Sequence, residues 1–406
     1  MSLRILLVSQ YYPPVWGGQQ QHVRALSMGL ASRGHRVTVV TFQPPGDEPH
    51  PHDPGVEIRH VRTSTQRIDL LYSTWRRFAP PLPDPEAVVA MRRIIRAERP
   101  DIIHAHDWLS RSAVPRVVHG DRPLIVTLHD YSLVCAQKRL VHRATPCSGP
   151  RVAKCLECAT THYGRFKGPP VTVGNWVGGR LEQRAASMYI AVSRAVAEGN
   201  RLERFGLPFR VIPNFVPDDI GALPEVDGPA LARLPDTGFL LFVGDVTQDK
   251  GVEALLAAYR ALDDPPPLVL IGEPFLSLDN AARGVLSLGA VSKATVMAAW
   301  RRSLVGVVPS IVPDACPTVV MEAMAVARPV VGTTTGGIPD LIDDGRTGLL
   351  VPHSDPAALA RALQRLLASP ELRARMSNAA LLKFKSFTAS QVVPSIEQVY
   401  QDMLRA

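Results

Sequence analysis

The chain has 406 residues, a hydrophobic fraction of 46% and a formal net charge of +8. This length exceeds one ordinary hydrophobic core and predicts two domains, and the balance of apolar and charged residues excludes a largely disordered chain. The basic residues are scattered rather than clustered, which disfavours a nucleic-acid partner and leaves phosphorylated ligands or an anionic lipid surface as uses for the charge.

Short Val/Ile/Leu-rich runs alternate with longer periodic segments through the first half of the chain. Runs that are apolar on both faces are typical of buried parallel strands. The predicted strands are 4–9, 36–42, 57–61, 101–105, 124–128, 188–192 and 210–212, with helices between most of them, for example 19–32 and 86–98. The series predicts an α/β domain with a doubly wound parallel sheet over residues 1–213.

Residues 214–236 are rich in Pro, Asp and Gly, lack a sustained period and are predicted to be an interdomain linker. A second alternating series follows over residues 237–385. Its predicted strands are 239–243, 268–271, 285–288, 305–308, 329–332 and 348–351, and its helices are 252–261, 293–301, 318–327, 356–368 and 371–383. The remaining segment, 386–406, contains a last helix that could pack back on the first domain.

None of these apolar segments reaches the roughly 18 residues that span a bilayer. The run that follows Met1 leads into a Pro13-Pro14 turn instead of a small-residue cleavage site. We therefore expect a cytoplasmic protein, with peripheral contact to the inner face of the membrane left open.

The glycine pair Gly17-Gly18 separates the first predicted strand from the first helix. Two glycines let the backbone approach a ligand closely, and the N-terminus of the following helix favours an anion. A phosphate contact and a tight turn needed only for packing both fit this loop. The spacing is not Gly-x-Gly-x-x-Gly, which argues against a dinucleotide oxidoreductase.

Two predicted strands of the first domain run into histidines. His104 and His106 lie on one side of a strand and could be metal ligands, although a hydrogen-bonded pair is the commoner arrangement. His129 follows the strand 124–128, at the end where open parallel sheets bind ligands. Its imidazole could hydrogen-bond a sugar hydroxyl or a backbone carbonyl near a reacting carbon.

The second domain carries a richer candidate site. Lys250 precedes a predicted helix and offers a point charge to a diphosphate, unless it is only a solvated lysine at a helix start. Cys316 and Thr318, on either side of Pro317, can present backbone N–H groups to a phosphate at the start of the helix 318–327.

Two acids accompany that helix start. Glu322 lies one turn into an otherwise apolar helix, where a carboxylate needs a partner such as ribose hydroxyls to offset its desolvation. Asp314, in the loop before the helix, can accept hydrogen bonds from the hydroxyls of a transferred sugar.

In this context, the two acids eight residues apart resemble the motif of the family-4 retaining glycosyltransferases, which have the GT-B fold of two Rossmann-like domains facing across a cleft. Supporting matches occur in order along the chain at 17–18, 106–107, 127–130, 191–193, 212–214, 250–251, 328–332 and 336–340. So many ordered matches are improbable by chance.

The resemblance implies a site in which the second domain binds a nucleotide sugar, with UDP- or GDP-sugar expected, and the first domain receives the acceptor. By the same resemblance, Glu322 binds ribose, Lys250 binds the diphosphate, Asp314 and the backbone of 316–318 orient the sugar, and His129 lies near the reacting carbon. The glycine loop of the first domain closes over the phosphates.

Two positions depart from the family. The first acid is usually Glu, and Asp314 is one methylene shorter, which changes its reach to the sugar. Asp245 stands where the family usually has a basic residue, so Lys250, helix ends or a nearby arginine must stabilise the diphosphate.

The chemistry implied is transfer with retention, in which Lys250 and helix N–H groups stabilise the leaving diphosphate. The sequence has no Asp-x-Asp motif, so catalysis is expected to need no metal cofactor. No carboxylate is placed by the resemblance as a covalent nucleophile, which favours a front-face path assisted by the leaving phosphate.

Four of the five cysteines fall in a loop-rich insertion, 135–168: Cys135, Cys147, Cys155 and Cys158. Four thiolates suit a tetrahedral structural zinc site, although only the last two have a zinc-like spacing. His142 and His162 are alternative ligands, and free thiols are the alternative to any metal. Cys316 is expected to be a small packing residue.

Two other functions remain compatible with the sequence, a nucleotide-sugar epimerase of the same fold and a non-catalytic nucleotide-sugar binder. The arginine-containing segments 62–85 and 138–168 look like walls of an acceptor site and favour transfer. The expected acceptor is a small molecule, a glycan or a lipid-linked compound.

Overall fold

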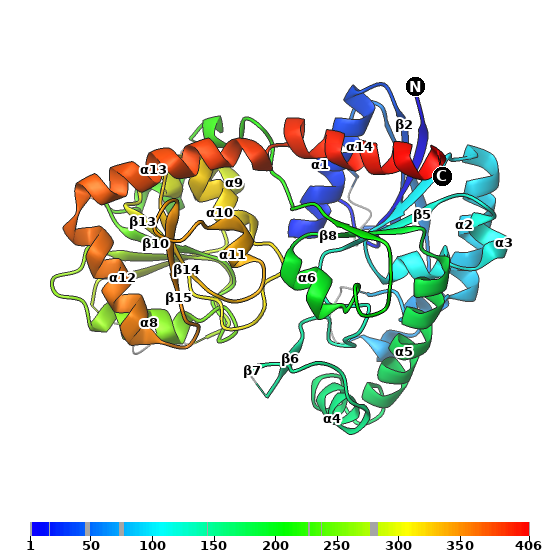
Figure 1. The fold of residues 1–406 in the computed structure, drawn as a ribbon, viewed down its shortest axis with the longest axis horizontal. Coiled ribbons are helices and arrows are strands. Elements are labelled where there is room, and N and C mark those ends of the chain that lie inside the picture. The colour runs from blue at the N-terminus through cyan, green and yellow to red at the C-terminus, as the bar shows by residue number, and fades with distance from the viewer. Residues whose placement is uncertain are drawn as a thin grey trace. The chain divides into compact units, whose positions relative to one another are not determined.

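The computed structural model describes residues 2–15, 17–44, 49–72, 77–143, 145–225, 228–236, 238–276 and 283–405. The chain divides into two compact units (Figure 1). Unit 1 comprises Met1–Arg143, Cys147–Pro213 and Ala389–Ala406, and unit 2 comprises Ala144–Pro146 and Asn214–Thr388. Thr237, the first residue of the expected second domain, lies outside the described residues.

Unit 1 is built on a seven-stranded parallel sheet in the order β3-β2-β1-β4-β5-β8-β9. Its strands are β1 (Arg4–Val8), β2 (Arg36–Phe42), β3 (Val56–Val61), β4 (Ile102–Ala105), β5 (Leu124–Leu128), β8 (Met188–Ala191) and β9 (Phe209–Val211). In the interior strand β1, Ile5 pairs with Val37 on β2 and with Ile102 on β4. The interior strands β1, β4 and β5 are covered on both faces and must be apolar on both, which is the pattern that predicted them.

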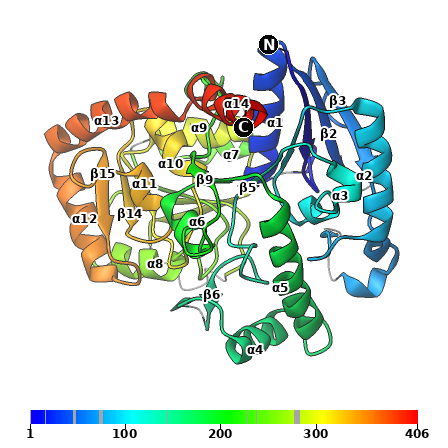
Figure 2. The same cartoon turned by 45° about the vertical axis from the view of Figure 1, so that its right-hand side comes forward.

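Helices of unit 1 cover this sheet. They are α1 (Gly18–Ser32), α2 (Pro85–Glu98), α3 (Arg116–His119), α4 (Val152–Tyr163), α5 (Gly168–Ala185), α6 (Arg194–Gly199) and α14 (Ala389–Arg405). The C-terminal helix α14 packs on α1, where Arg33 donates to Glu397 at 2.6 Å (Figure 1). The insertion 135–168 is less loop-like than expected, because α4 occupies twelve of its residues and packs beside α5 (Figure 2).

The first half of the chain also contains shorter helical turns and strands. They are the 3-10 turns Ser64–Arg67, Asp69–Leu71 and Trp108–Ser112 and the two-residue strands β6 (Val141–His142) and β7 (Thr145–Pro146). Throughout the described ranges, no helix is long and apolar enough to cross a membrane.

Unit 2 contains a six-stranded parallel sheet in the order β12-β11-β10-β13-β14-β15. The strands are β10 (Leu240–Val243), β11 (Leu268–Ile271), β12 (Val285–Gly289), β13 (Val305–Val308), β14 (Val330–Thr333) and β15 (Gly348–Val351). Its helices are α7 (Pro229–Ala232), α8 (Val252–Arg260), α9 (Lys293–Arg302), α10 (Thr318–Ala325), α11 (Ile338–Leu341), α12 (Pro356–Ala368) and α13 (Pro370–Phe384), with 3-10 turns at Ile220–Ala222 and Lys385–Phe387.

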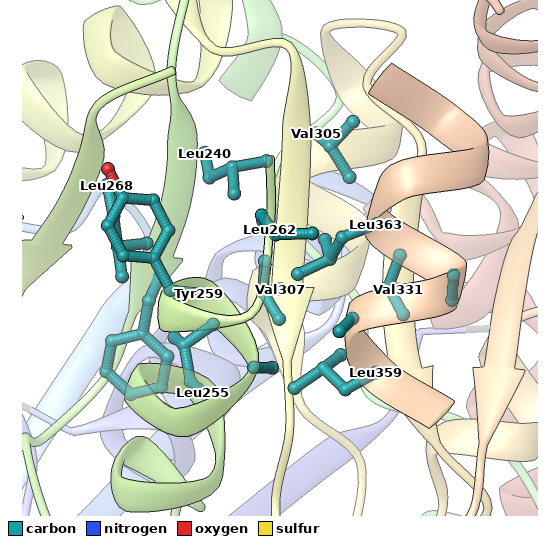
Figure 3. Packing of buried hydrophobic residues seen from close by; sticks show 14 of the residues in the cluster. Leu240, Leu255, Tyr259, Leu262, Leu268, Val305, Val307, Val331, Leu359 and Leu363 are labelled. Carbon is teal, nitrogen blue, oxygen red and sulfur yellow. The ribbon is translucent and has the colours of Figure 1, made fainter. Parts of the chain in front are cut away.

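The core of unit 2 lies between this sheet and the helices α8 and α12 (Figure 3). Leu255 and Tyr259 of α8 and Leu359 and Leu363 of α12 are at most 2% exposed. They pack against sheet residues such as Val307. This packing fixes the strands whose carboxyl ends carry the candidate site.

The segment 214–236 differs from the predicted linker, because it packs within unit 2. Its Phe215, Ile220 and Leu231 are buried, and Val216 N donates to Phe387 O at 3.0 Å. These anchors are single apolar residues between prolines and glycines, so they leave no period in the sequence. Unit 2 also continues to Thr388, three residues beyond the expected boundary at 385.

Candidate functional site

In unit 2, Lys250 and Asp314 meet beyond the carboxyl ends of β10 and β13. Lys250 Nζ lies 2.6 Å from Asp314 Oδ2, and the two side chains are 35% and 19% exposed. Ser310 Oγ donates to the same carboxylate oxygen at 3.3 Å. Two residues that the sequence assigned separately to diphosphate and sugar therefore form one ion pair, and the ammonium also remains partly open to solvent.

Backbone packing fixes the loop that holds Asp314. Gly337 N donates to Asp314 O at 2.7 Å. Gly336 has a φ of 59°, and a Cβ there would lie 2.2 Å from Asp314 O. Glycine at 336 is therefore required by a positive φ and a close approach to the Asp314 backbone, which the sequence motif alone did not reveal.

Glu322 is buried in α10 with its two oxygens in different situations. The residue is 1% exposed, and Oε1 accepts from Lys293 Nζ of α9 at 2.6 Å. Oε2 has no hydrogen-bond partner among the described residues. A buried carboxylate with half its acceptor capacity unused is costly unless a ligand supplies donors.

Lys293 was not identified from the sequence. It begins α9, and 29 positions separate it from the acid that it pairs with. A lysine at the start of a helix is normally solvated, and its side chain is 40% exposed here. Only the packing of α9 against α10 brings it to Glu322, so no local sequence signal could have found it.

The N-terminus of α10 presents backbone donors beside these side chains. Its N-cap is Pro317, no side chain caps the helix, and its first turn contains no acid. Thr318 is half-buried, and Cys316 is buried and accepts a hydrogen bond at its carbonyl from Asn214 Nδ2. Burial raises the pKa of Cys316 to about 12, so its thiol stays protonated and the residue serves packing.

Asp245 follows β10, and its side chain is exposed. Its carbonyl accepts from Thr247 N at 2.9 Å, within a tight turn. The acid therefore stands on the solvent side of the loop that leads to Lys250.

In unit 1, three histidines gather beyond the ends of β4 and β5. His22 of α1, His106 and His129 have ring nitrogens within 4.8 Å of one another. His106 Nδ1 and His129 Nε2 are 3.1 Å apart, and the His22 and His129 rings are 4.7 Å apart between centroids. His22 was missed from the sequence because a histidine in an amphipathic helix carries no distinctive signal.

His104 lies beneath this cluster and has a different role. Its Nδ1 lies 2.7 Å from Tyr400 OH, and its Nε2 lies 2.6 Å from Thr127 Oγ1. Both ring nitrogens are occupied, so His104 is a hydrogen-bonded core residue and not a metal ligand. Of the pair 104 and 106, only His106 joins the cluster.

The buried imidazoles are neutral. Burial, with neighbouring histidines as a smaller cause, lowers the pKa of His22 and His106 well below the usual 6.5 and that of His104 to about 3. His129 is half-buried and less enclosed. At His22 and His106 the imidazole is therefore uncharged and adds no positive charge to the cluster.

These lowered pKa values make stability depend on pH. Between pH 3 and 6.5, His104 is protonated in the unfolded chain and neutral in the folded chain. The free energy of unfolding therefore rises with pH over this range. Each such histidine contributes up to about 1.4 kcal/mol per pH unit. The free energy of unfolding of His104→Gln can be measured by urea unfolding from about pH 5 to pH 7. It should rise less steeply with pH than that of the parent, by the equivalent of roughly one proton. Identical slopes for the variant and the parent would contradict this.

The glycine loop opens α1. Gly17 is its N-cap and extended, no side chain caps the helix, and the first turn contains no acid. Gly18 is exposed, and a Cβ there would meet no protein atom within 4 Å. Gln19 Nε2 donates to the buried Asp107 at 2.9 Å, which ties the loop to the end of β4. The chain itself gives no steric reason for glycine at 18, in contrast to 336.

Two family models match the chain. One described as Glycosyltransferase Family 4 matches residues 16–220, and one described as Glycosyl transferases group 1 matches residues 237–369. The chain is also 28% identical to a glycogen synthase of Mycobacterium tuberculosis over 435 residues, which cover 98% of this chain and 94% of that protein.

Solved structures share the fold. Sucrose-phosphate synthase from Thermosynechococcus elongatus matches with a TM-score of 0.75 at 21% identity, covering 99% of each chain. Anabaena Alr3699/HepE in complex with UDP-glucose matches with a TM-score of 0.68 at 16% identity, covering 98% of this chain and 100% of that one. Units 1 and 2 are accordingly the two Rossmann-like domains of a GT-B fold.

Proposed function

The chain belongs to glycosyltransferase family 4, whose model matches residues 16–220, and we propose that it transfers a sugar from a UDP- or GDP-sugar to an acceptor hydroxyl with retention at the anomeric carbon. The family match and the glycosyltransferase relatives support the use of a nucleotide sugar.

The observation that carries the donor assignment is the state of Glu322. Its carboxylate is buried, one oxygen is bound by Lys293, and the other has no partner among the described residues. The two vicinal hydroxyls of a ribose provide the donors that this carboxylate lacks. Charge-assisted hydrogen bonds of this kind are short and strong, which suits the anchoring of a nucleotide.

Lys250 and the N-terminus of α10 would stabilise the diphosphate. When the bond between the anomeric carbon and the phosphate oxygen breaks, the electron pair stays on the diphosphate, whose charge increases. The Lys250 ammonium, 35% exposed, can exchange its contact with Asp314 for a phosphate oxygen. Asp314 would then be free to accept hydrogen bonds from hydroxyls of the sugar.

These fixed groups make a divalent metal unnecessary for the proposed step. The acceptor oxygen forms the new bond on the face from which the diphosphate leaves, and the acceptor proton passes to the leaving phosphate. This path needs no enzymatic nucleophile. In unit 1, we assign His129 to the neighbourhood of the reacting carbon, with neutral His106 fixing its ring through the 3.1 Å contact.

A panel of UDP-, GDP-, ADP- and TDP-sugars tests the proposal. Thermal shift and nucleotide release are measured in EDTA, with and without a mixture of sugar acceptors. We expect one base to raise Tm most and its sugar to be turned over without metal, with the α-linkage of the donor preserved in the product by NMR.

The same panel separates the alternatives. A nucleotide-sugar epimerase would convert the donor sugar without an acceptor, and a non-catalytic binder would raise Tm without releasing nucleotide. Inversion at the anomeric carbon, or a strict requirement for a divalent ion, would refute the mechanism while leaving the donor site in place.

A further inference from the structure

Four cysteine side chains of unit 1 line one small cavity, whose lining includes none of His22, His106 and His129. The cavity measures about 30 Å³, and its other lining residues are mostly apolar, including Val141 and Trp176. The cysteines that line it are Cys135, Cys147, Cys155 and Cys158. A volume of this size is sufficient for a single ion or water molecule.

The four residues come from three separate pieces of chain. Cys155 and Cys158 lie three positions apart in α4, so they share one face of the helix. Cys135 lies in the turns that follow β5, and Cys147 follows β7. All four are partly buried free thiols. A common ligand would therefore join α4 to the two loops that carry Cys135 and Cys147.

The backbone after Cys135 forms a tight turn, in which Lys138 N donates to Cys135 O at 3.0 Å. Lys138 and Leu140 reach this geometry with φ values of 65° and 52°, in the left-handed region. Such residues cost on the order of 1–3 kcal/mol each and persist where the surroundings impose them.

A side-chain amide donates to the sulfur of Cys158. Gln137 Nε2 donates to its Sγ at 3.1 Å and to its carbonyl at 2.8 Å. Tyr163 OH donates to Ala136 O at 2.7 Å, so α4 is already held against the turn after Cys135. Neither His142 nor His162 lines the cavity, which leaves the thiols as the ligand set.

We propose that these four cysteines bind one Zn²⁺ ion in a tetrahedral tetrathiolate site. Binding releases four thiol protons to solvent and forms four Zn–S bonds of about 2.3 Å. No three of the four sulfur atoms lie within 4.8 Å of one another, so binding requires that side-chain rotation bring them together. Lys154, which also lines the cavity, partly offsets the net negative charge of the site.

The site would fix the segment that leads away from His129. Cys135 N donates to Tyr131 O at 2.9 Å, and Tyr131 N donates to Lys138 O at 3.0 Å. A metal anchored at Cys135 thereby restrains the turns that begin two residues after His129. This role is structural and does not depend on the identity of the donor or of the acceptor.

Elemental analysis of the full-length protein tests the proposal. The protein is expressed with added zinc, purified through a tag without histidines and dialysed against metal-free buffer. We expect about one zinc per chain. The double variant C155S/C158S should lose it, and Cys316→Ser, which changes the one cysteine outside the cavity, should retain it.

Cobalt substitution keeps the test decisive if the double variant folds poorly. The wild-type chain is stripped of metal and titrated with Co²⁺, and tetrathiolate coordination is recognised by strong visible d–d bands and sulfur-to-cobalt charge-transfer absorption. Their appearance at one equivalent supports the site. Absence of stoichiometric zinc with no such spectrum, or equal zinc in C155S/C158S, overturns it. None of these readouts involves sugar transfer, so they are independent of the proposed activity.

Discussion

Replacing Lys250 by alanine is expected to lower kcat/KM for donor turnover by roughly 10²–10³-fold, the usual effect of removing one preorganised donor from a developing anion. In the free protein this ammonium lies 2.6 Å from Asp314. If it stabilises the leaving diphosphate, its loss affects the transition state more than the ground state, so kcat should fall more than KM rises. Initial rates of nucleotide release in EDTA measure both.

Two further variants make this result interpretable. Lys250→Arg keeps a cation and should recover part of the rate. Lys383→Ala removes a lysine of a similar ion pair in unit 2, with Asp343 at 2.7 Å, and should leave turnover unchanged. If Lys250→Ala turns over donor as fast as the parent, the diphosphate assignment is wrong and the pair with Asp314 is only structural.

Replacing Glu322 by glutamine is expected to raise KM for the donor about 10- to 100-fold, because hydrogen bonds to a charged group contribute roughly 1.5–3 kcal/mol. The ribose is remote from the reacting carbon, so kcat should change little. Glu253→Gln, an exposed acid in the first turn of α8, is the matched control and should behave as the parent.

A modified donor sharpens the assignment of Glu322. A nucleotide sugar whose nucleoside lacks the 2′ and 3′ hydroxyls should bind the parent poorly, and the variant should no longer distinguish it from the normal donor. If Glu322→Gln still binds the normal donor better than the modified one, another residue makes the ribose contact. Because Lys293 loses its carboxylate partner in this variant, Tm is recorded alongside, and Glu322→Gln combined with Lys293→Met separates stability from binding.

The α/β architecture could be predicted from the sequence because its signal is local. Strands such as β4 and β13 are buried on both faces and must be apolar throughout, so each appears as a short hydrophobic run. Glu322 is a comparable case, since a lone acid on an apolar helix needs a partner wherever the helix packs. The segment 214–236 shows the limit, because its buried anchors are isolated residues with no period.

The sequence by itself determined the two parallel-sheet domains, the family resemblance and most of the residues proposed to hold the donor. Only the tertiary structure decided how those residues are paired: Lys250 with Asp314, Lys293 with Glu322, and His22 with His106 and His129. It also decided that His104 is a core residue and that the four cysteines of the insertion share one cavity. The reason is physical. Apolar periodicity is imposed on each segment by its own burial, whereas a contact between side chains from different helices depends on how those helices pack, which no single segment encodes.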